Sequence, residues 1–558
     1  MATIILQADN CQEHWIQSRD ALQLLEKKDS IIHSVVIALC ESADLPDGLK
    51  TENEFHRLGR AIAIHTNLNT LVITLQGLSS SLIENMMDGL CENRSIQNLH
   101  LNRFTLGDEL GCEFRKLGSF FGGNENLKSF ECSWTRLRKT ETIRSFLAPL
   151  AHRRRPLESI TLNNCEIRDN GAEEIKLFFE TNPHALPRKI SFEGNMLGDE
   201  GFEYIGEIIN HSSSAFEELS LLHNRMRGGE GFRVLGAALA RQERTLKMLS
   251  IGPSCDIIPM FPRGLILFAK EFLSNPNIFP EKVIFTGIRV DLDAFRILGN
   301  VLSSRTSASP IELLDMRHAS FTRNGFLAFI NALEGSPGQT PKVLHISKNE
   351  PEHITTIFAI SDIVRKPNCS LEKFWMRSLS LDDDSVAHIA NSLSKNEKIL
   401  EFTVNTDEIS ITGWDHVANA LCDTTTIAST YTSNHTLVDF GGWQRPTKIS
   451  WYLELNKNPD KTMVARIKVI DCHFARNFEA GANHFTGIQP FLVAELLSYV
   501  HRFLLLHDKT RLTYNNNPFN QGRWNSENNS LTIHYLMLKN NLSMLDERSW
   551  PKRKRQRI

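Results

Sequence analysis

The sequence predicts an α/β fold, a leucine-rich-repeat solenoid with a curved parallel sheet on its concave side, helices on its convex side and helical caps. A short apolar pattern, Leu-x-x-Leu-x-Leu in outline, returns about every 28 to 31 residues. Within each unit, alternating apolar residues typical of a short strand are followed by apolar residues at helical spacing. One such unit cannot bury its own apolar face, so neighbouring units must stack to stabilise the fold.

The repeat that begins at Leu157 shows the pattern clearly. Its strand is expected within Leu157–Leu162, and Asp169 with Gly171 fits a turn that leads into a helix. The inward face of that helix is expected to carry Ile175, Leu177 and Phe178. The repeat starts are placed at Ile32, Leu68, Ile96, Leu127, Leu157, Pro187, Phe216, Leu246, Pro280, Ile311, Pro341, Leu371, Ile399 and Leu437, of which Leu246, Pro280 and Pro341 begin degenerate copies.

Each repeat also has a position, after the strand, where the chain turns away. An asparagine side chain is suited to this position because it can hydrogen-bond to the turning backbone. The residues found there include Cys40, Cys165, Asn195, Asn224 and Asn349.

Four segments follow from these patterns. Residues 1–31 are expected to form an N-terminal helical cap, residues 32–446 about fourteen repeats, and residues 447–508 a C-terminal helical cap. Residues 509–558 are expected to form a largely disordered tail, because the segment 514–530 is dense in Asn with Gly, Pro and Ser. We therefore expect one long repeat domain rather than several globular ones.

Composition and charge indicate the cellular compartment of the protein and exclude some kinds of binding site. Hydrophobic residues make up 41% and charged residues 23% of the chain, and its formal net charge of -3 gives no general attraction to nucleic acid or an anionic membrane. The ten cysteines occur singly, without a CxxC pair, so neither a disulfide framework nor a metal site is expected. The apolar run Phe491–Leu506 is interrupted by charge, and the chain starts without a signal peptide pattern. A soluble intracellular protein, in the nucleus or cytoplasm, is expected.

The chain ends in a compact basic cluster, Lys552, Arg553, Lys554 and Arg555. Such clusters are typical of segments that nuclear import receptors bind, which makes an import receptor one expected partner. The alternative is that these residues form a solvated charged terminus.

The repeat length, the Asp-x-Gly after the second apolar block and the alternation of strand and helix resemble the ribonuclease-inhibitor type of leucine-rich repeat, over residues 32 to 440. This resemblance implies the fold more than a function, because the class includes enzyme inhibitors, innate immune receptors and Ran GTPase-activating proteins. Tyr431–Leu437, Ala465–Ile470 and His473-Phe474 are similar to the C-terminal end of diatom ribonuclease-inhibitor-like proteins of unassigned activity. That second likeness implies capping helices.

In this fold, the residues between the buried leucines line the concave face. The early and middle repeats offer mostly small polar side chains there, with Trp134 and a few charged residues. Three later repeats are richer in positive charge, and adjacent strands lie about 4.8 Å apart, so these side chains should form one patch. Arg and Trp supply large contact energies at interfaces, and positive charge favours an acidic partner. The predicted partner-binding residues are Arg317, His318, His345, Lys348, Lys373, Trp375 and Arg377.

The sequence predicts that the protein is not an enzyme and needs no cofactor. It contains no phosphate loop, no His-Glu-x-x-His helix and no Gly-x-Ser-x-Gly elbow. The leading hypothesis is therefore a scaffold that binds a protein on its concave face. Two alternatives stay open: a GTPase regulator of the Ran GTPase-activating type, and a nucleic-acid-associated protein that uses the basic tail. Asn-x-Ser/Thr triplets at Asn93, Asn368 and Asn434 arise often by chance and are given no weight.

Overall fold

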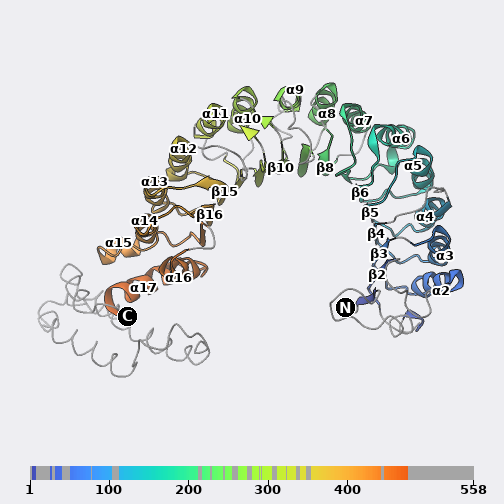
Figure 1. Ribbon diagram of the computed structural model, residues 1–558, viewed down its shortest axis with the longest axis horizontal. Helices are drawn as coiled ribbons and strands as arrows, with labels where there is room; N and C mark the ends of the chain where they lie inside the picture. The colour runs from blue at the N-terminus through green and yellow to red at the C-terminus, as the bar shows by residue number, and fades with distance from the viewer. Residues whose placement is uncertain are drawn as a thin grey trace, which may run out of the picture. The chain divides into compact units, whose positions relative to one another are not determined.

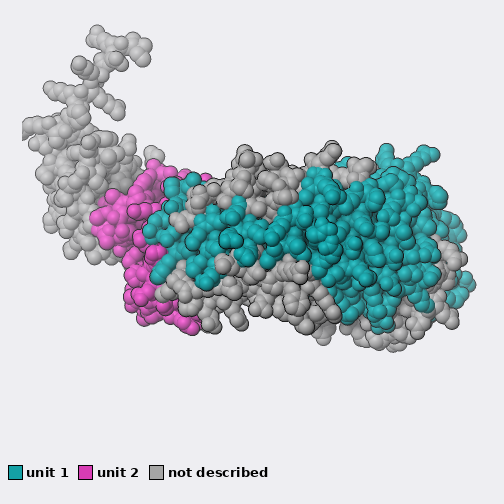
Figure 2. Space-filling model, turned by 90° about the horizontal axis from the view of Figure 1, so that it is seen from above, with its two compact units in different colours: residues 1–379 teal, residues 380–558 magenta. Residues whose placement is uncertain are grey.

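A computed structural model describes most of the chain between residues 3 and 475. The described residues are 3–7, 25–27, 32–40, 51–76, 78–103, 112–211, 216–225, 229–242, 246–253, 262–272, 280–287, 289–290, 292–304, 311–318, 320–321, 323–334, 340–346, 354–441 and 445–475. Most of the predicted N-terminal cap, the second half of the predicted C-terminal cap, the tail and the basic cluster Lys552–Arg555 therefore lie outside them. The chain divides into two compact units, Met1–Leu379 and Ser380–Ile558, coloured teal and magenta in Figure 2.

In unit 1, strands and helices alternate along the chain, and the strands pair in sequence order into a parallel sheet. Within this unit the strands line the inner side of the curve and the helices line the outer side (Figure 1). The strands are β1 Thr3–Gln7, β2 Ser34–Cys40, β3 Thr70–Gln76, β4 Asn98–Asn102, β5 Ser129–Ser133, β6 Ser159–Asn163, β7 Lys189–Ser191, β8 Glu218–Asn224, β9 Met248–Pro253, β10 Lys282–Phe285, β12 Leu313–Asp315, β14 Val343–His345 and β15 Lys373–Ser380.

The helices of unit 1 each follow a strand. They are α2 Glu52–Ala63, α3 Ser80–Leu90, α4 Cys112–Gly123, α5 Thr140–Leu147, α6 Arg168–Thr181, α7 Asp199–Asn210, α8 Glu230–Ala240, α9 Pro262–Phe272, α10 Leu292–Ser304, α11 Arg323–Glu334 and α12 Ile354–Arg365, with short 3-10 turns η1 Ala148–His152 and η2 Pro183–Ala185. Two short strands, β11 Arg289–Val290 and β13 Ser320–Phe321, pair with each other in parallel.

In the described part of unit 2, strands and helices again alternate, and two helices and a π-helical turn follow the last strand. It contains α13 Asp383–Leu393, β16 Glu401–Asn405, α14 Ile411–Leu421, α15 Ile427–Tyr431, β17 Asp439–Phe440, α16 Thr447–Asn456, α17 Lys461–Val469 and the π-helical turn η5 Ile470–Ala475. Strands β16 and β17 pair in parallel. In α17, Val464, Ala465 and Ile467 are buried, whereas Met463 is exposed.

The predicted α/β repeat fold is confirmed. A strand begins two residues after each of the fourteen predicted repeat starts, from Ser34 after Ile32 to Asp439 after Leu437, the degenerate copies included. Strand β1 was not predicted. It lies in the segment expected to be a helical cap, and its residues Thr3–Gln7 pair with Ser34–Ala38 of β2.

One continuous row of apolar side chains forms the core of unit 1, because the strands pair in register. Each strand contributes the residue at the same position, and every member is buried. The row is Val35, Leu71, Leu99, Phe130, Ile160, Ile190, Leu219, Leu249, Val283, Leu314, Leu344 and Phe374. Successive strand residues point to opposite faces, so the residues on either side of this row face away from the helices.

The helices pack closely on the sheet and on one another. In α6 the buried face carries Ala172, Ile175 and Phe179, whereas Leu177, which was expected to point inward, is 48% exposed. A helix turns 100° per residue, so Leu177 lies well away from the face set by Ile175 and Phe179. Between α2 and α3, a Cβ atom added at Gly59 would lie 2.1 Å from the carbonyl oxygen of Met86, so glycine permits this close approach.

The predicted asparagine position is confirmed at Asn195 and Asn224, which form a ladder between repeats, whereas Asn349 and the side chain of Cys40 lie outside what the structure describes. The Oδ1 atom of Asn195 accepts from the backbone N–H of Cys165 at 2.9 Å, and the Oδ1 of Asn224 accepts from that of Asn195 at 2.9 Å. The asparagines bond to the preceding repeat, whereas Asp169 bonds to the following one. Its Oδ1 accepts from the N–H groups of Gly198 and Gly201 at 2.6 and 3.1 Å and thus caps the next helix, α7.

A second ladder, which was not predicted, lies where each helix returns to the sheet. Asn93 and Asn434 are buried there, with exposures of 1% and 3%, and each hydrogen-bonds to backbone of a neighbouring repeat. Asn124 and the guanidinium of Arg153 take the same role in two further repeats. Because their side chains are enclosed and bonded, Asn93 and Asn434 cannot serve as glycosylation acceptors in the folded protein.

Candidate functional site

The described members of the predicted partner-binding set lie on, or just after, the three neighbouring strands β12, β14 and β15 of unit 1. Asp315, His345 and Trp375 are register partners across these strands. The preceding residue on each strand belongs to the buried apolar row, so this second row faces away from the helices. We call Arg317, His318, His345, Lys373, Trp375 and Arg377 the concave patch. Lys348, the seventh predicted residue, lies outside the described residues.

Asp315 supplies negative charge at the base of the concave patch. Its side chain is only 5% exposed, and the Nε of Arg317 donates to its Oδ2 at 2.9 Å. The backbone N–H of Arg317 donates to Oδ1 at 3.1 Å. The carboxylate therefore fixes the arginine and offsets part of its charge, while the guanidinium side chain stays 47% exposed.

His345 is neutral at neutral pH. Burial lowers the pKa of His345 to about 4; Asp315, whose Oδ2 lies 3.7 Å from Nδ1, raises it, while the positive charges of Arg317 and Arg377 lower it further. The ring of His345 meets the ring of Trp375 edge to face, with centroids 5.1 Å apart and planes at 88°. His345 therefore acts in the patch as an aromatic support for the tryptophan rather than as a charge.

Strand β15 presents the predicted Lys373, Trp375 and Arg377 on one face. Phe374 and Met376, which alternate with them, are completely buried. The Nζ of Lys373 lies 5.8 Å from the centre of the Trp375 ring, a cation–π contact. Arg377 is exposed. The arrangement places Trp375 between a lysine on its own strand, β15, and a histidine on the neighbouring strand β14.

Arg317 and Arg377 lie two residues after the register partners Asp315 and Trp375, so they share one register position. Ser347, at the same position after His345, lies outside the described residues. His318 is exposed and adopts a left-handed backbone conformation with φ of 56°. Its positive form would also oppose protonation of His345. The described members of the concave patch are thus brought together on adjacent strands.

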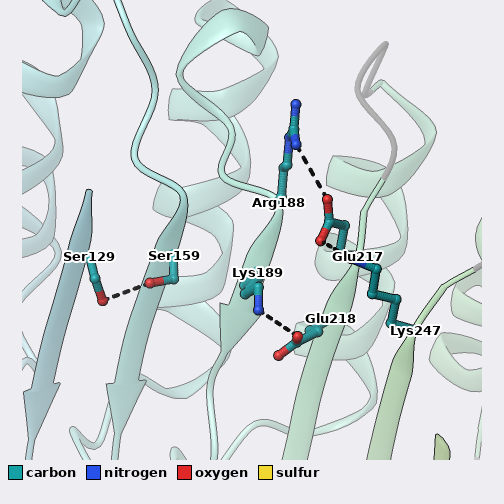
Figure 3. A network of polar contacts seen from close by, with 7 residues as sticks. All are labelled: Ser129, Ser159, Arg188, Lys189, Glu217, Glu218 and Lys247. Carbon is teal, nitrogen blue, oxygen red and sulfur yellow. Dashed lines mark hydrogen bonds and ion pairs between the residues drawn. The ribbon is translucent and has the colours of Figure 1, made fainter.

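Charges in the middle repeats are paired from strand to strand instead (Figure 3). The Nζ of Lys189 lies 2.6 Å from the Oε1 of Glu218 on the next strand. At the strand starts, Glu217 receives Arg188 at 3.4 Å and Lys247 at 2.8 Å. Each of these cations faces a carboxylate, so the charges of this region largely offset one another.

Trp134, in the early repeats, was predicted to line the concave face but was not among the predicted partner-binding residues. Trp134 is 61% exposed and has a φ of 60°. Its backbone N–H donates to the carbonyl of Asn163 at 2.9 Å. In the equivalent position of later repeats stand Asn164 and Gly194, both also at positive φ. Exposure depends on this turn geometry, which a strand pattern does not reveal.

The described part of the chain contains no group of three His, Cys, Asp or Glu side chains placed to hold a metal ion. None of the helices within it is long and apolar enough to cross a membrane.

The alternating strands and helices define a leucine-rich-repeat solenoid, and its repeats resemble the ribonuclease-inhibitor type. In sequence the chain is similar to the ribonuclease inhibitor of Sus scrofa, with 23% identity over 267 residues. The match covers 47% of this chain and 55% of the pig protein, so the chain spans about half the length of this curated relative. No protein-family model matches the sequence.

Solved structures with a similar chain include an internalin from Listeria monocytogenes, at 10% identity and a TM-score of 0.34, covering 66% of this chain and 87% of that one. Another is in the complex of Rad7 and Elc1 from yeast, at 14% identity and a TM-score of 0.35, covering 71% of this chain and 81% of that one.

Proposed function

We propose that this protein is a non-catalytic scaffold that binds a protein partner with an acidic surface through the concave patch. The observation that carries the proposal is the face of β15, where Lys373, Trp375 and Arg377 stand on a fully buried layer. Because His345 and Lys373 both contact the ring of Trp375, the ring is oriented before a partner arrives. A pre-oriented tryptophan loses little entropy on binding, and Trp and Arg dominate the energy of many interfaces.

The charge of the patch favours an acidic partner. Arg317, Lys373 and Arg377 are positive, His345 is neutral, and the buried Asp315 offsets one charge. Complementary charge raises the rate of association and excludes basic partners. The pig relative is by name an inhibitor of ribonuclease, which is itself a protein, and this supports a protein ligand for the present chain.

The test is affinity purification from cells with chemical crosslinking, using three forms of the full chain. They are the wild type, the triple variant Lys373→Ala, Trp375→Ala and Arg377→Ala, and the control Thr70→Ala, Val72→Ala and Thr74→Ala on the same face of β3. We expect the patch variant to lose the partner by at least about tenfold, since buried Trp and Arg anchors each contribute about 1 to 4 kcal/mol. The control variant should keep it. Retention of the same partner by a folded patch variant would remove the patch from the proposal and leave the rest of the concave face.

The two alternatives give different outcomes in separate assays. A GTPase regulator of the Ran GTPase-activating type would accelerate GTP hydrolysis in a single turnover. A nucleic-acid-associated protein would bind RNA or DNA with a steep dependence on salt. Loss of that binding when residues 551–558 are deleted would assign it to the basic tail.

A further inference from the structure

Two cysteines far apart in the sequence meet in unit 2. The Sγ atoms of Cys422 and Cys472 are 3.3 Å apart, and both residues are thiols. Cys422 directly follows helix α14, and Cys472 lies in the π-helical turn η5, fifty residues further along the chain. The sulfurs of a disulfide lie about 2.05 Å apart, so side-chain movements of about 1 Å would bring this pair to bonding distance.

Neighbouring contacts hold the two thiols together. The Nε2 of His473 lies 2.8 Å from the Oγ1 of Thr430, which donates to the carbonyl of Asp423 at 2.5 Å. His473 adjoins Cys472, and Asp423 adjoins Cys422. Thr430 and His473 are almost completely buried. The backbone segments that carry the thiols are therefore fixed to each other one residue away from the sulfurs.

The two thiols differ in access to solvent. Cys422 is 1% exposed, whereas Cys472 is only partly buried. The hydroxyl of Tyr452 lies 3.4 Å from the Sγ of Cys472. A small oxidant can thus reach Cys472 before Cys422, which is shielded from solvent.

A buried cation lies beside the pair. Lys468 is completely buried, and its Nζ hydrogen-bonds to the carbonyls of Leu421 and Asn434 at 2.7 and 2.9 Å and to the Nδ1 of His435 at 3.2 Å. These three contacts use all three N–H groups of the ammonium. Burial lowers the pKa of Lys468 to about 7, and thiolate charge at either cysteine raises it.

The same coupling acts on the thiols. The contact with Cys472 and burial raise the pKa of Cys422, and the charge of Lys468 opposes that rise. Burial and then Lys468 lower the pKa of His435 to about 4, so its ring stays neutral and can accept the lysine's hydrogen bond. In its protonated form Lys468 stabilises negative charge as a thiol of the pair reacts.

From this geometry we infer that Cys422 and Cys472 form an oxidation site at which a hydroperoxide converts the two thiols into a disulfide. The thiolate of Cys472 attacks one oxygen of hydrogen peroxide; the O–O bond breaks, a sulfenic acid forms and hydroxide leaves, taking a proton to become water. The sulfur of Cys422 then attacks the sulfenic sulfur. The S–S bond forms, the S–O bond breaks, and the leaving hydroxide takes the proton of Cys422 as a second water. The two thiols lose two electrons, and the peroxide gains them.

The disulfide ties the end of α14 to turn η5 and closes a loop of fifty residues. Closing a loop restricts the unfolded chain and resists separation of the joined segments. The oxidised protein should therefore unfold at a higher temperature and resist proteolysis between residues 422 and 472. Treatment of the oxidised protein with dithiothreitol should restore the original unfolding temperature and the original sensitivity to proteolysis.

The test treats the full chain with graded hydrogen peroxide, alkylates the remaining thiols in denaturant and maps unreduced peptides by mass spectrometry. We expect a peptide pair linked through Cys422 and Cys472 and the loss of two alkylatable thiols. Cys132 and Cys165 provide an internal control, because both are completely buried and should remain alkylatable. Recovery of Cys422 and Cys472 as thiols, or separate conversion of each to sulfinic acid without a linked peptide, would overturn the inference.

Two variants define the order of reaction. In Cys422→Ser, the sulfenic acid of Cys472 should accumulate and be trapped by dimedone, since no second thiol resolves it. In Cys472→Ser, the thiol of Cys422 should survive peroxide because it is shielded. Equal oxidation of Cys422 in that variant and in the wild type would contradict the assigned order. If either variant fails to fold, the peptide map of the wild type still decides whether the disulfide forms.

Discussion

The side chain of Asn224 hydrogen-bonds to the backbone of the preceding repeat, in which Asn195 occupies the equivalent position. Its Oδ1 accepts from the N–H groups of Asn195 and Leu197 at 2.9 and 3.1 Å, and its Nδ2 donates to the carbonyl of Phe192 at 2.9 Å. Asn195 makes matching contacts one repeat further back. Each asparagine is thus a link between two repeats rather than a local cap, and it is completely buried.

Replacement Asn224→Ala should lower the free energy of unfolding by about 3 to 5 kcal/mol, because it leaves several buried backbone groups unpaired at about 1 to 3 kcal/mol each. Denaturant unfolding followed by circular dichroism measures the loss. The control Asn210→Ala lies on the exposed end of α7 and should cost less than about 0.5 kcal/mol. Equal effects of the two substitutions would show that the ladder does not couple the repeats.

Arg153 replaces asparagine in the second ladder. It is 3% exposed, and its guanidinium donates to the carbonyls of Phe121, Asn124 and Leu127 at 2.6 to 2.7 Å. Burial lowers the pKa of Arg153, so the cation is held at a desolvation cost that these hydrogen bonds offset.

The variant Arg153→Met should therefore lose about 3 kcal/mol of stability, since three carbonyls lose their partners. Arg153→Lys should recover less than half of that loss, because an ammonium cannot reproduce the planar fork of donors. The neighbouring exposed residue offers the control Arg154→Met. A lysine variant as stable as the wild type would mean that charge alone suffices at this position.

The strands were predictable because the signal for them is local and periodic. Apolar alternation located every strand from β2 to β17 in the main sheets, even in degenerate copies such as the one at Pro341, where only Val343–His345 form β14. Strand β1 was missed because its five residues lie ahead of the periodic sequence pattern, which begins at Ile32. The prediction that Leu177 points inward from α6 was wrong, since neighbouring apolar residues on a helix cannot all point inward.

The candidate site was predictable only in part. The alternation of apolar and polar residues in the sequence places Lys373, Trp375 and Arg377 on one face of a strand. It could not show that Asp315 is buried under Arg317, or that the ring of His345 supports Trp375, because these facts depend on side-chain packing between strands. The pair Cys422 and Cys472 was equally hidden, since its members are fifty positions apart in the sequence and three helices, α15, α16 and α17, lie between them.

The terminal basic cluster gives a prediction for location in the cell. Replacing Lys552, Arg553, Lys554 and Arg555 by alanine should shift a fluorescently tagged full chain from the nucleus to the cytoplasm, because import receptors need the clustered positive charge. Exchange of the two lysines for arginine keeps the charge and should keep the distribution. An unchanged distribution in the alanine variant would favour the solvated terminus.

Trp134 offers a test of backbone strain. A φ of 60° is costly for residues with a Cβ atom, and the indole is 61% exposed, so packing offsets little of that cost. Trp134→Gly should be more stable than Trp134→Ala by about 1 kcal/mol, because both remove the indole but only glycine relieves the strain. Thermal unfolding compares the two. The opposite order, which is normal for a helix or strand, would show that the turn relaxes without its native side chain.

His345 gives the concave patch a dependence on pH. Its pKa is about 4 in the folded protein and 6.5 as the ordinary value for an unfolded chain. Between these values the unfolded state binds more protons, so the stability that His345 contributes is present above pH 6.5 and is lost as the pH falls towards 4. From pH 6.5 to pH 5 the loss should approach about 2 kcal/mol, at 1.36 kcal/mol per unit. The side chain is only 15% exposed, which limits screening by solvent.

Denaturant unfolding of the wild type and of His345→Gln at pH 7, 6 and 5 measures this effect. The glutamine side chain does not titrate, so the wild type should lose more stability than the variant as the pH falls, and the gap between their two curves should change by about 2 kcal/mol. Curves that stay parallel from pH 7 to pH 5 would mean that Asp315 keeps the folded pKa of His345 near its ordinary value. In that case His345 would be protonated on mild acidification, and the concave patch would gain a positive charge beside Trp375 instead of losing stability.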